Sequence, residues 1–308
     1  MTTARPPEGG HDASATPVPP DIDARIHALP CWHAAGTVEP LPGGMTNHNY
    51  RVRDGRGSFV VRLGEDLPLH GVLRVQELAA ARAAHAVGLS PEVVYAGPGV
   101  MVSRYVDGRT LQPQDLRDAG RLPQVVELVR RCHHDLPRVL PPGHPEFRVF
   151  DVIHGYGVRL QAVQGQLLGA RLGGLLQLAR GLEAALDVGD RVFGHNDLLA
   201  GNFLDDGARL WLIDWDYAGF NTALFDLANL SANNGFSRQQ AHHLLALYDG
   251  TAPDATRMRA LHAMQAASMV REVLWGAVSH HHARVQFDFA GYTHTWLNRL
   301  AAHGRVAG

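Results

Sequence analysis

Five polar residues in one short stretch have the types and spacing that phosphoryl transfer requires. His195 and Asp197 form a His-x-Asp sequence, Asn202 follows the Asp, and two acids, Asp214 and Asp216, come shortly afterwards. A carboxylate can accept the proton of an attacking hydroxyl, and carboxylate and amide oxygens are ligands that Mg²⁺ prefers. The pattern therefore predicts a site in which Asp197 is the base and Asn202 and Asp214 bind the metal. His195 is expected to support the loop rather than to perform chemistry.

A predicted β-hairpin would bring these residues together. Residues 202–204 and 209–213 are short apolar segments compatible with strands, and Asp206-Gly207 between them is a turn sequence. Folding about that turn places residue 202 beside residue 211, and it returns Asp214 to the loop that carries Asp197. The alternative is a polar hairpin whose acids are only solvated.

Two motifs carry a resemblance to a known family. They are HNDLLAGNFL at residues 195–204 and IDWDY at residues 213–217. Together they are similar to the signature of the aminoglycoside phosphotransferase and choline kinase superfamily, whose members have a protein-kinase-like fold. The resemblance implies that Asp197 is the catalytic base and that Asn202 and Asp214 are Mg²⁺ ligands. It makes Asp216, where many relatives have Glu, a third candidate ligand.

The same resemblance, which extends from about Leu41 to Arg299, implies an α+β fold with two lobes. A disordered tail is expected at 1–21, a small β-rich N-lobe at 22–105 and a larger, mainly helical C-lobe at 106–308. Helices in the C-lobe are predicted at 120–136, 151–165, 172–187, 224–234, 237–248, 255–281 and 287–302, and a strand is predicted at 191–193.

The chain contains no lysine, so all 28 residues in the Lys+Arg count are arginine. A Gly-Lys-Ser/Thr phosphate loop and lysine Schiff-base chemistry are thereby excluded. A kinase-like fold must then hold the phosphates of ATP with an arginine. Arg62, on a predicted strand, stands where the family has that cation. Glu77, on a helix predicted at 70–87, is its expected partner, and a surface role for either residue is the alternative.

The resemblance also implies further contacts with ATP. The segment from Leu41 to Val52 resembles the hairpin that covers the phosphates, where backbone amides can face phosphate oxygens. The segment from Gly97 to Gly108 resembles the strand and hinge that bind adenine. Besides Arg62 and Glu77, the residues implied in nucleotide binding are Gly44, Asn47, Asn49, Ser103 and Tyr105.

An aromatic set near the C-terminus indicates the acceptor substrate. Trp275, Phe289 and Tyr292 resemble the C-terminal aromatic residues of choline and ethanolamine kinases, and Tyr217 adjoins the metal motif. Aromatic faces attract cations, so the four side chains could form a cage for an ammonium group. Choline or ethanolamine is therefore the expected substrate.

Two positions depart from that pattern. Glu272 stands where many choline kinases have a second tryptophan, and Asn233 stands near the expected place of an acid for the ammonium. Both are candidate substrate contacts, and Glu272 could replace the lost negative charge. Three alternatives stay open. The first is the same chemistry on thiamine, an aminoglycoside or a sugar; the second is a catalytically silent nucleotide-binding protein; the third is an aromatic stripe that only joins two helices.

Composition adds weaker expectations. A formal net charge of −2 over 308 residues gives no reason to expect nucleic acid as a partner. No stretch approaches the about 18 apolar residues of a membrane span. Two distant cysteines, Cys31 and Cys132, fit a reduced, cytoplasmic protein, and a homodimer is an open alternative to a monomer. Asp226 is expected to brace the catalytic loop through backbone hydrogen bonds, or else to be a simple acid at a helix N-terminus.

Overall fold

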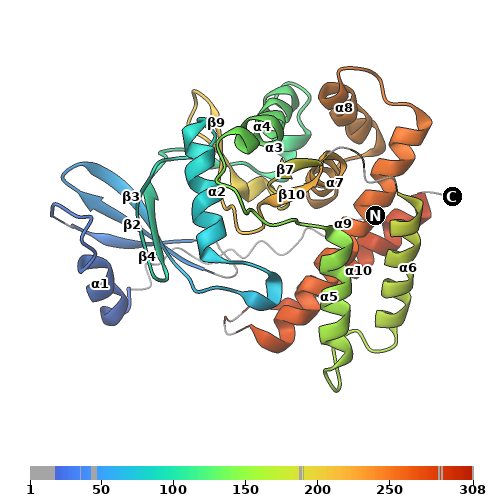
Figure 1. The fold of residues 1–308 in the computed structure, drawn as a ribbon, viewed down its shortest axis with the longest axis horizontal. Coiled ribbons are helices and arrows are strands. Elements are labelled where there is room, and N and C mark those ends of the chain that lie inside the picture. The colour runs from blue at the N-terminus through green and yellow to red at the C-terminus, as the bar shows by residue number, and fades with distance from the viewer. Residues whose placement is uncertain are drawn as a thin grey trace. The chain divides into compact units, whose positions relative to one another are not determined.

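The computed structural model of the chain describes residues 18–34, 36–42, 47–186, 189, 191–283, 285 and 287–306. These residues form two compact units, and Figure 1 labels most of their helices and strands. The first unit comprises 18–65 and 92–105, and the second comprises 66–91 and 106–306. Most of the predicted tail at 1–21 lies outside the described residues, but its last two residues begin helix α1 (Pro20–His27).

The first unit is a five-stranded antiparallel sheet with one helix, α1. Its strand order is β1-β2-β3-β5-β4, and the strands are β1 (Val38–Leu41), β2 (His48–Asp54), β3 (Gly57–Leu63), β4 (Val93–Gly97) and β5 (Val100–Arg104). In β3 the side chains of Phe59, Val61 and Leu63 are buried and those between them are not, because successive side chains of a strand point to opposite faces. Together with Ile26 of α1 and buried side chains of β2 and β5 they form the core of the unit.

The second unit is mainly helical. Its α-helices are α2 (Arg74–Ala86), α3 (Pro113–Arg117), α4 (Leu122–Asp135), α5 (Val149–Gln161), α6 (Arg171–Ala185), α7 (Ala223–Asn233), α8 (Arg238–Asp249), α9 (Ala255–His282) and α10 (Phe289–Val306), with short 3₁₀ turns at Pro68–His70, Leu136–Arg138 and Ala200–Asn202. Every helix predicted in the C-lobe is confirmed, with its ends displaced by four residues at most. The helix predicted at 70–87 is confirmed as α2. It begins later than predicted, at Arg74, because a 3₁₀ turn at Pro68–His70 precedes it.

Helix α9 is the central helix of this unit, in contact with α5, α6, α7 and α10 (Figure 1). Nearly all of its residues from Leu261 to Ser279 are buried, as expected for a helix that is covered on every side. Two charged residues, Arg271 and Glu272, lie within this buried stretch. In the part of the chain that the structure describes, no helix has the length and apolar character needed to cross a membrane.

Two small sheets carry the predicted chemistry. β7 (Arg191–Gly194) pairs with β10 (Gly219–Thr222), and β8 (Phe203–Asp205) lies between β6 (Arg109–Thr110) and β9 (Leu210–Leu212). The strands predicted around 191–193, 202–204 and 209–213 are confirmed. β6 and β10 were not predicted, because such short segments have too few residues to show an alternating pattern.

The hairpin between β8 and β9 has a different register from the predicted one. The backbone N–H of Ile213 donates to the carbonyl of Asn202 at 3.0 Å, so residue 202 lies opposite residue 213 and not 211. The cause is the Asp206 carboxylate, which accepts two backbone N–H groups of the loop and the indole N–H of Trp211. These bonds stabilise a longer loop than a two-residue turn, and they bring Asp214 next to Asn202.

The units also divide differently from the predicted lobes, because segment 66–91, expected in the N-lobe, belongs to the second unit. The Ser90 hydroxyl donates to the carbonyl of Leu212, and the Leu212 N–H donates to the carbonyl of Leu89 at 2.9 Å. Arg74, at the start of α2, forms an ion pair with Asp216. These contacts attach α2 and the segment after it to the strands that carry the acid motif.

Candidate active site

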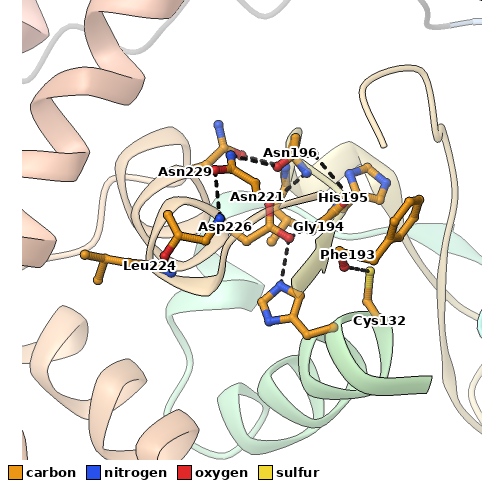
Figure 2. A network of polar contacts seen from close by, with 12 residues as sticks. Cys132, Phe193, Gly194, His195, Asn196, Asn221, Leu224, Asp226 and Asn229 are labelled. Atoms are coloured by element: carbon orange, nitrogen blue, oxygen red, sulfur yellow. Dashed lines mark hydrogen bonds and ion pairs between the residues drawn. The ribbon is translucent and has the colours of Figure 1, made fainter. Parts of the chain in front are cut away.

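The loop after β7 carries the His-x-Asp sequence, and one buried carboxylate holds its backbone (Figure 2). Asp226 of α7 accepts the backbone N–H of His195 at 2.8 Å and that of Asn196 at 2.7 Å. Asn196 has a φ of 64°, in the left-handed region that Asn tolerates better than most residues. Its side-chain amide donates to the carbonyls of Tyr217 at 2.9 Å and Gly219 at 3.1 Å. The expectation that Asp226 braces this loop is confirmed.

The same helix holds the continuation of the loop. Asn229 accepts the N–H of Leu198 at 2.7 Å, and Asn234, at the C-terminal cap of α7, accepts the N–H of Ala200 at 3.0 Å. Side chains from one helix therefore bind the backbone on both sides of Asp197. The position of the Asp197 carboxylate is set by this support of its main chain.

The Asp226 carboxylate is buried but keeps its charge. Nε2 of His133, on α4, lies 2.9 Å from Oδ2 of Asp226, and its Nδ1 lies 2.7 Å from the hydroxyl of Tyr248. Burial raises the pKa of a carboxyl group, but the hydrogen bond with His133, the two nearby imidazoles and the backbone N–H of His195 outweigh it, so the pKa of Asp226 is lowered. An anion at this point is what the loop N–H groups require.

The environment of His195 fits a supporting role. The side chain is fully buried, and its Nε2 lies 3.0 Å from the carbonyl oxygen of Ile213. Since a carbonyl only accepts, Nε2 carries the proton of this bond. Burial lowers the pKa of His195, which keeps the imidazole neutral. The ring also packs against Trp215, with 4.8 Å between ring centres, so His195 joins the loop to the acid motif.

The two predicted metal ligands meet through the hairpin. Asn202 donates from Nδ2 to the carbonyl of Asp197 at 2.8 Å, which leaves Oδ1 as the remaining polar atom of its side chain. Asp214 directly follows Ile213, whose N–H binds the Asn202 carbonyl, and it has a φ of 68°. One amide oxygen and one carboxylate suit Mg²⁺, a hard cation that is usually bound through one or two carboxylates and keeps several waters.

Glu77 and Asp216 are joined by an arginine that the sequence did not reveal. Nη1 of Arg74 lies 2.7 Å from Oε2 of Glu77 and 2.7 Å from Oδ1 of Asp216. Glu77 is 3% exposed, so the alternative of a solvated helix glutamate is wrong. Arg62, the predicted partner of Glu77, belongs to the first unit, and that pairing stays a prediction.

Asp197 lies in a strongly acidic environment. Burial raises the pKa of Asp197 to about 8; the Arg271 guanidinium acts in the opposite direction. The carboxylates of Glu272, Asp214 and Asp216 also raise the pKa of Asp197, because each disfavours a further negative charge. Added positive charge in this volume would lower that pKa and favour the ionised, proton-accepting form.

In the first unit, residues predicted to contact the nucleotide share one face of the sheet. Arg62 of β3 pairs with Asn49 of β2 on one side and with Met101 of β5 on the other, and Ser103 lies two residues further along β5. Directly opposed residues, and residues two apart in a strand, point to the same face. Asn49, Arg62 and Ser103 therefore lie on the face opposite the buried side chains of β3.

Other predicted nucleotide contacts lie around this face. The Tyr105 ring lies 4.1 Å from the guanidinium carbon of Arg51, and the Tyr105 N–H donates to the carbonyl of Ser58 at 3.0 Å. Asn47, just before β2, is buried. Gly44 lies outside the described residues.

Five predicted substrate residues are brought together by α9, α10 and the acid motif. The indole N–H of Trp275 donates to the Tyr217 hydroxyl at 2.8 Å, and the Tyr292 hydroxyl donates to Oε2 of Glu272 at 2.6 Å. The Trp275 ring meets those of Phe289 and Tyr292 edge to face, with centres 5.7 Å and 5.4 Å apart. The aromatic set is thus a single cluster that includes a buried carboxylate.

Gly276 allows this cluster to form. A Cβ on Gly276 would lie 2.6 Å from Oγ1 of Thr293 and 2.9 Å from Cδ1 of Tyr292, so only glycine lets α10 approach α9 this closely. Asn233, the sixth predicted substrate residue, lies on α7 and is 6% exposed. Neither polar atom of its side chain has a hydrogen-bond partner among the described residues.

Three residues of the site were not predicted: His70, Arg74 and Arg271. Arg271 had a usable signal, because it adjoins Glu272 in an otherwise apolar part of a helix, and charged residues are rarely buried unless paired. His70 and Arg74 offered none. Their partners, Tyr156 and Asp216, are distant in sequence.

His70 predicts a specific loss of stability in acid. Its ring nitrogens lie 3.0 Å from the Tyr156 hydroxyl and 3.3 Å from that of Ser279, and burial, with nearby positive charges, lowers the pKa of His70 to about 4. Because the unfolded chain binds a proton at this residue below about pH 6.5 and the folded chain does not, the free energy of unfolding should fall by about 3 kcal/mol between pH 6.5 and 4. Urea unfolding of wild type and His70→Gln across this range measures the contribution. Parallel curves for the two proteins would contradict it.

A loop aspartate, a following asparagine and a second acidic motif lie together in the helical unit of a chain that also has a β-rich unit, and they define a phosphotransferase of the protein-kinase-like class. The chain matches the phosphotransferase enzyme family over residues 37–261, and it belongs to that family.

Relatives of this chain include small-molecule kinases. A probable ethanolamine kinase of Arabidopsis thaliana is 24% identical over an aligned length of 294, which covers 83% of this chain and 76% of that protein. A choline/ethanolamine kinase family protein of Mesorhizobium loti has a similar crystal structure, with a TM-score of 0.75 and 30% identity over 92% of this chain and 93% of that one. LicA in complex with AMP shares the fold, with a TM-score of 0.69 and 22% identity over 88% of this chain and 93% of that one.

Proposed function

We propose that the protein transfers the γ-phosphoryl group of ATP to the hydroxyl of a small amino alcohol, choline or ethanolamine. The observation that carries the proposal is a continuous set of side chains: Arg271 lies between the carboxylates of Asp197 and Glu272, and Glu272 accepts the Tyr292 hydroxyl. A proton acceptor for the alcohol is thereby linked to an aromatic cluster with a negative charge. The names of two relatives, which refer to ethanolamine and to choline/ethanolamine, support this substrate class.

Each proposed role follows from the chemistry of the side chain. Asp197 accepts the hydroxyl proton of the substrate as the oxygen attacks. Asn202 and Asp214 would hold Mg²⁺, which neutralises phosphate charge when bound. Asp216 was a third candidate ligand. One of its carboxylate oxygens forms an ion pair with Arg74, which Asp216 thereby helps to position. Metal binding by Asp216 stays a prediction.

The nucleotide is assigned to the first unit and the residues next to it in the family pattern. Arg62 would bind the phosphates, with Asn49 and Ser103 on the same sheet face. Gly44, Asn47, Tyr105 and Glu77 complete the proposed contacts. The structure of LicA with AMP supports the use of an adenine nucleotide by this fold.

A coupled assay of ADP release tests the proposal directly. Purified protein with MgATP is offered choline, ethanolamine, thiamine and kanamycin. Turnover that depends on choline or ethanolamine supports the proposal, and turnover only with kanamycin or thiamine would reassign the substrate. Tight MgATP binding without turnover on any alcohol would identify a silent nucleotide-binding protein.

Tyr292 provides a test of the aromatic contribution. Tyr292→Leu should raise the KM for the amino alcohol by about 2- to 30-fold, because one aromatic face contributes about 0.5–2 kcal/mol to binding a cation. The KM for ATP should stay the same. Tyr292→Phe keeps the ring but loses the hydrogen bond to Glu272, so it is the matched control for the aromatic face, and its KM for the amino alcohol should rise less than that of Tyr292→Leu. Equal effects of Tyr292→Leu on both KM values would indicate a packing role instead.

A further inference from the structure

Arg271 is a charged residue in the interior of the second unit. It is 1% exposed, and its guanidinium carbon lies 4.4 Å from the ring centre of Tyr217 and 5.5 Å from that of Phe147. Nη1 donates to Oε1 of Glu272 at 2.6 Å and lies 3.7 Å from Oδ1 of Asp197. A charge this deeply buried persists only where opposite charges surround it.

The two carboxylates keep this arginine charged. Burial lowers the pKa of a guanidinium, but Glu272 and then Asp197 outweigh it, so the pKa of Arg271 is raised. One guanidinium faces two carboxylates. When Asp197 is ionised, as its role as the proton acceptor requires, this leaves one negative charge unbalanced. A substrate that carries a single positive charge would balance it.

We propose that Arg271 is a positioning residue for phosphoryl transfer. It sets the carboxylates of Asp197 and Glu272 relative to each other, so that the hydroxyl and the cationic group of one substrate are held together. The inference rests on the proposed function, which assigns the hydroxyl to Asp197. Arginine suits the task because its planar guanidinium stacks on aromatic rings and stays charged when buried, whereas the pKa of a lysine shifts readily on burial.

Three variants test this role with the alcohol that the wild-type enzyme turns over best. Arg271→Met should lower kcat by about 10- to 100-fold through loss of alignment at the reacting oxygen. The KM for the cationic substrate should not rise, because the cluster becomes more negative. Arg271→Lys should recover part of kcat. The double variant Arg271→Met with Glu272→Gln restores the charge balance, so it should recover thermal stability but not kcat.

The controls separate alignment from stability. Arg257 lies on the same helix and pairs with Asp249 near the surface, so Arg257→Met should keep the wild-type kcat. Recovery of kcat in the double variant would overturn the proposal, because Arg271 would then only neutralise Glu272. A raised KM at unchanged kcat in Arg271→Met would also overturn it. The substrate screen on the wild-type protein, without any variant, shows whether the proposed substrate class is wrong. A wild-type protein that is inactive on every alcohol would overturn both proposals.

Discussion

Replacing Asp197 with asparagine should lower kcat by about 10²- to 10⁴-fold, the usual contribution of a general base. The amide has the size of the carboxylate but cannot take the hydroxyl proton. The loop should keep its shape, because its backbone is held by Asp226 and Asn229. The Asp197 side chain makes none of these bonds. Single-turnover ADP release gives the loss in rate, and titration with MgATP should give nearly the wild-type affinity.

A matched control comes from the surface of the same unit. Asp151 forms a long, exposed contact with Arg148, so Asp151→Asn should keep both kcat and nucleotide affinity. A loss of less than about tenfold in Asp197→Asn would contradict its role as the base. A parallel loss of MgATP affinity would show that the substitution disturbs the fold of the loop.

Replacing Asp226 with alanine should lower the free energy of unfolding by about 3–5 kcal/mol, because each buried donor that loses its acceptor costs about 1–3 kcal/mol. The change leaves the backbone N–H groups of His195 and Asn196 without an acceptor and His133 without its carboxylate. A loss of this size is a large part of the stability of an ordinary domain. Urea unfolding measures it, and kcat should fall as well because the loop carries Asp197.

An exposed helix cap shows what an ordinary acid contributes. The Asp254 side chain accepts the N–H of Arg257 at 2.7 Å at the start of α9, and Asp254→Ala should lower the free energy of unfolding by about 1 kcal/mol. If Asp226→Ala lowered the free energy of unfolding no more than Asp254→Ala does, the hydrogen bonds of Asp226 would not be what holds the loop. Asp226→Asn keeps the shape of the side chain, so its loss in free energy of unfolding should lie between those of Asp226→Ala and Asp254→Ala.

The hairpin shows how far local patterns can be trusted. Apolar segments and a turn sequence were enough to predict that 202–204 and 209–213 pair, but the register was wrong. Side-chain bonds of Asp206, which compete with a tight turn, decided it. The alternation of apolar and polar residues in β3 was by itself a weak signal for the face on which Arg62 lies. The pairing of Arg62 with Asn49 and Met101 placed it on the face of the sheet opposite the buried side chains of β3.

The sequence alone determined the class of chemistry. The loop from His195, the following asparagine and the acid motif lie close along the chain, and the absence of lysine led to the prediction that an arginine binds the phosphates. Only the tertiary structure placed Arg271 between Asp197 and Glu272, and Arg74 between Glu77 and Asp216. The reason is physical: spacing reports which residues share a local element, whereas the packing of α9 and α2 against distant segments decides which charges meet.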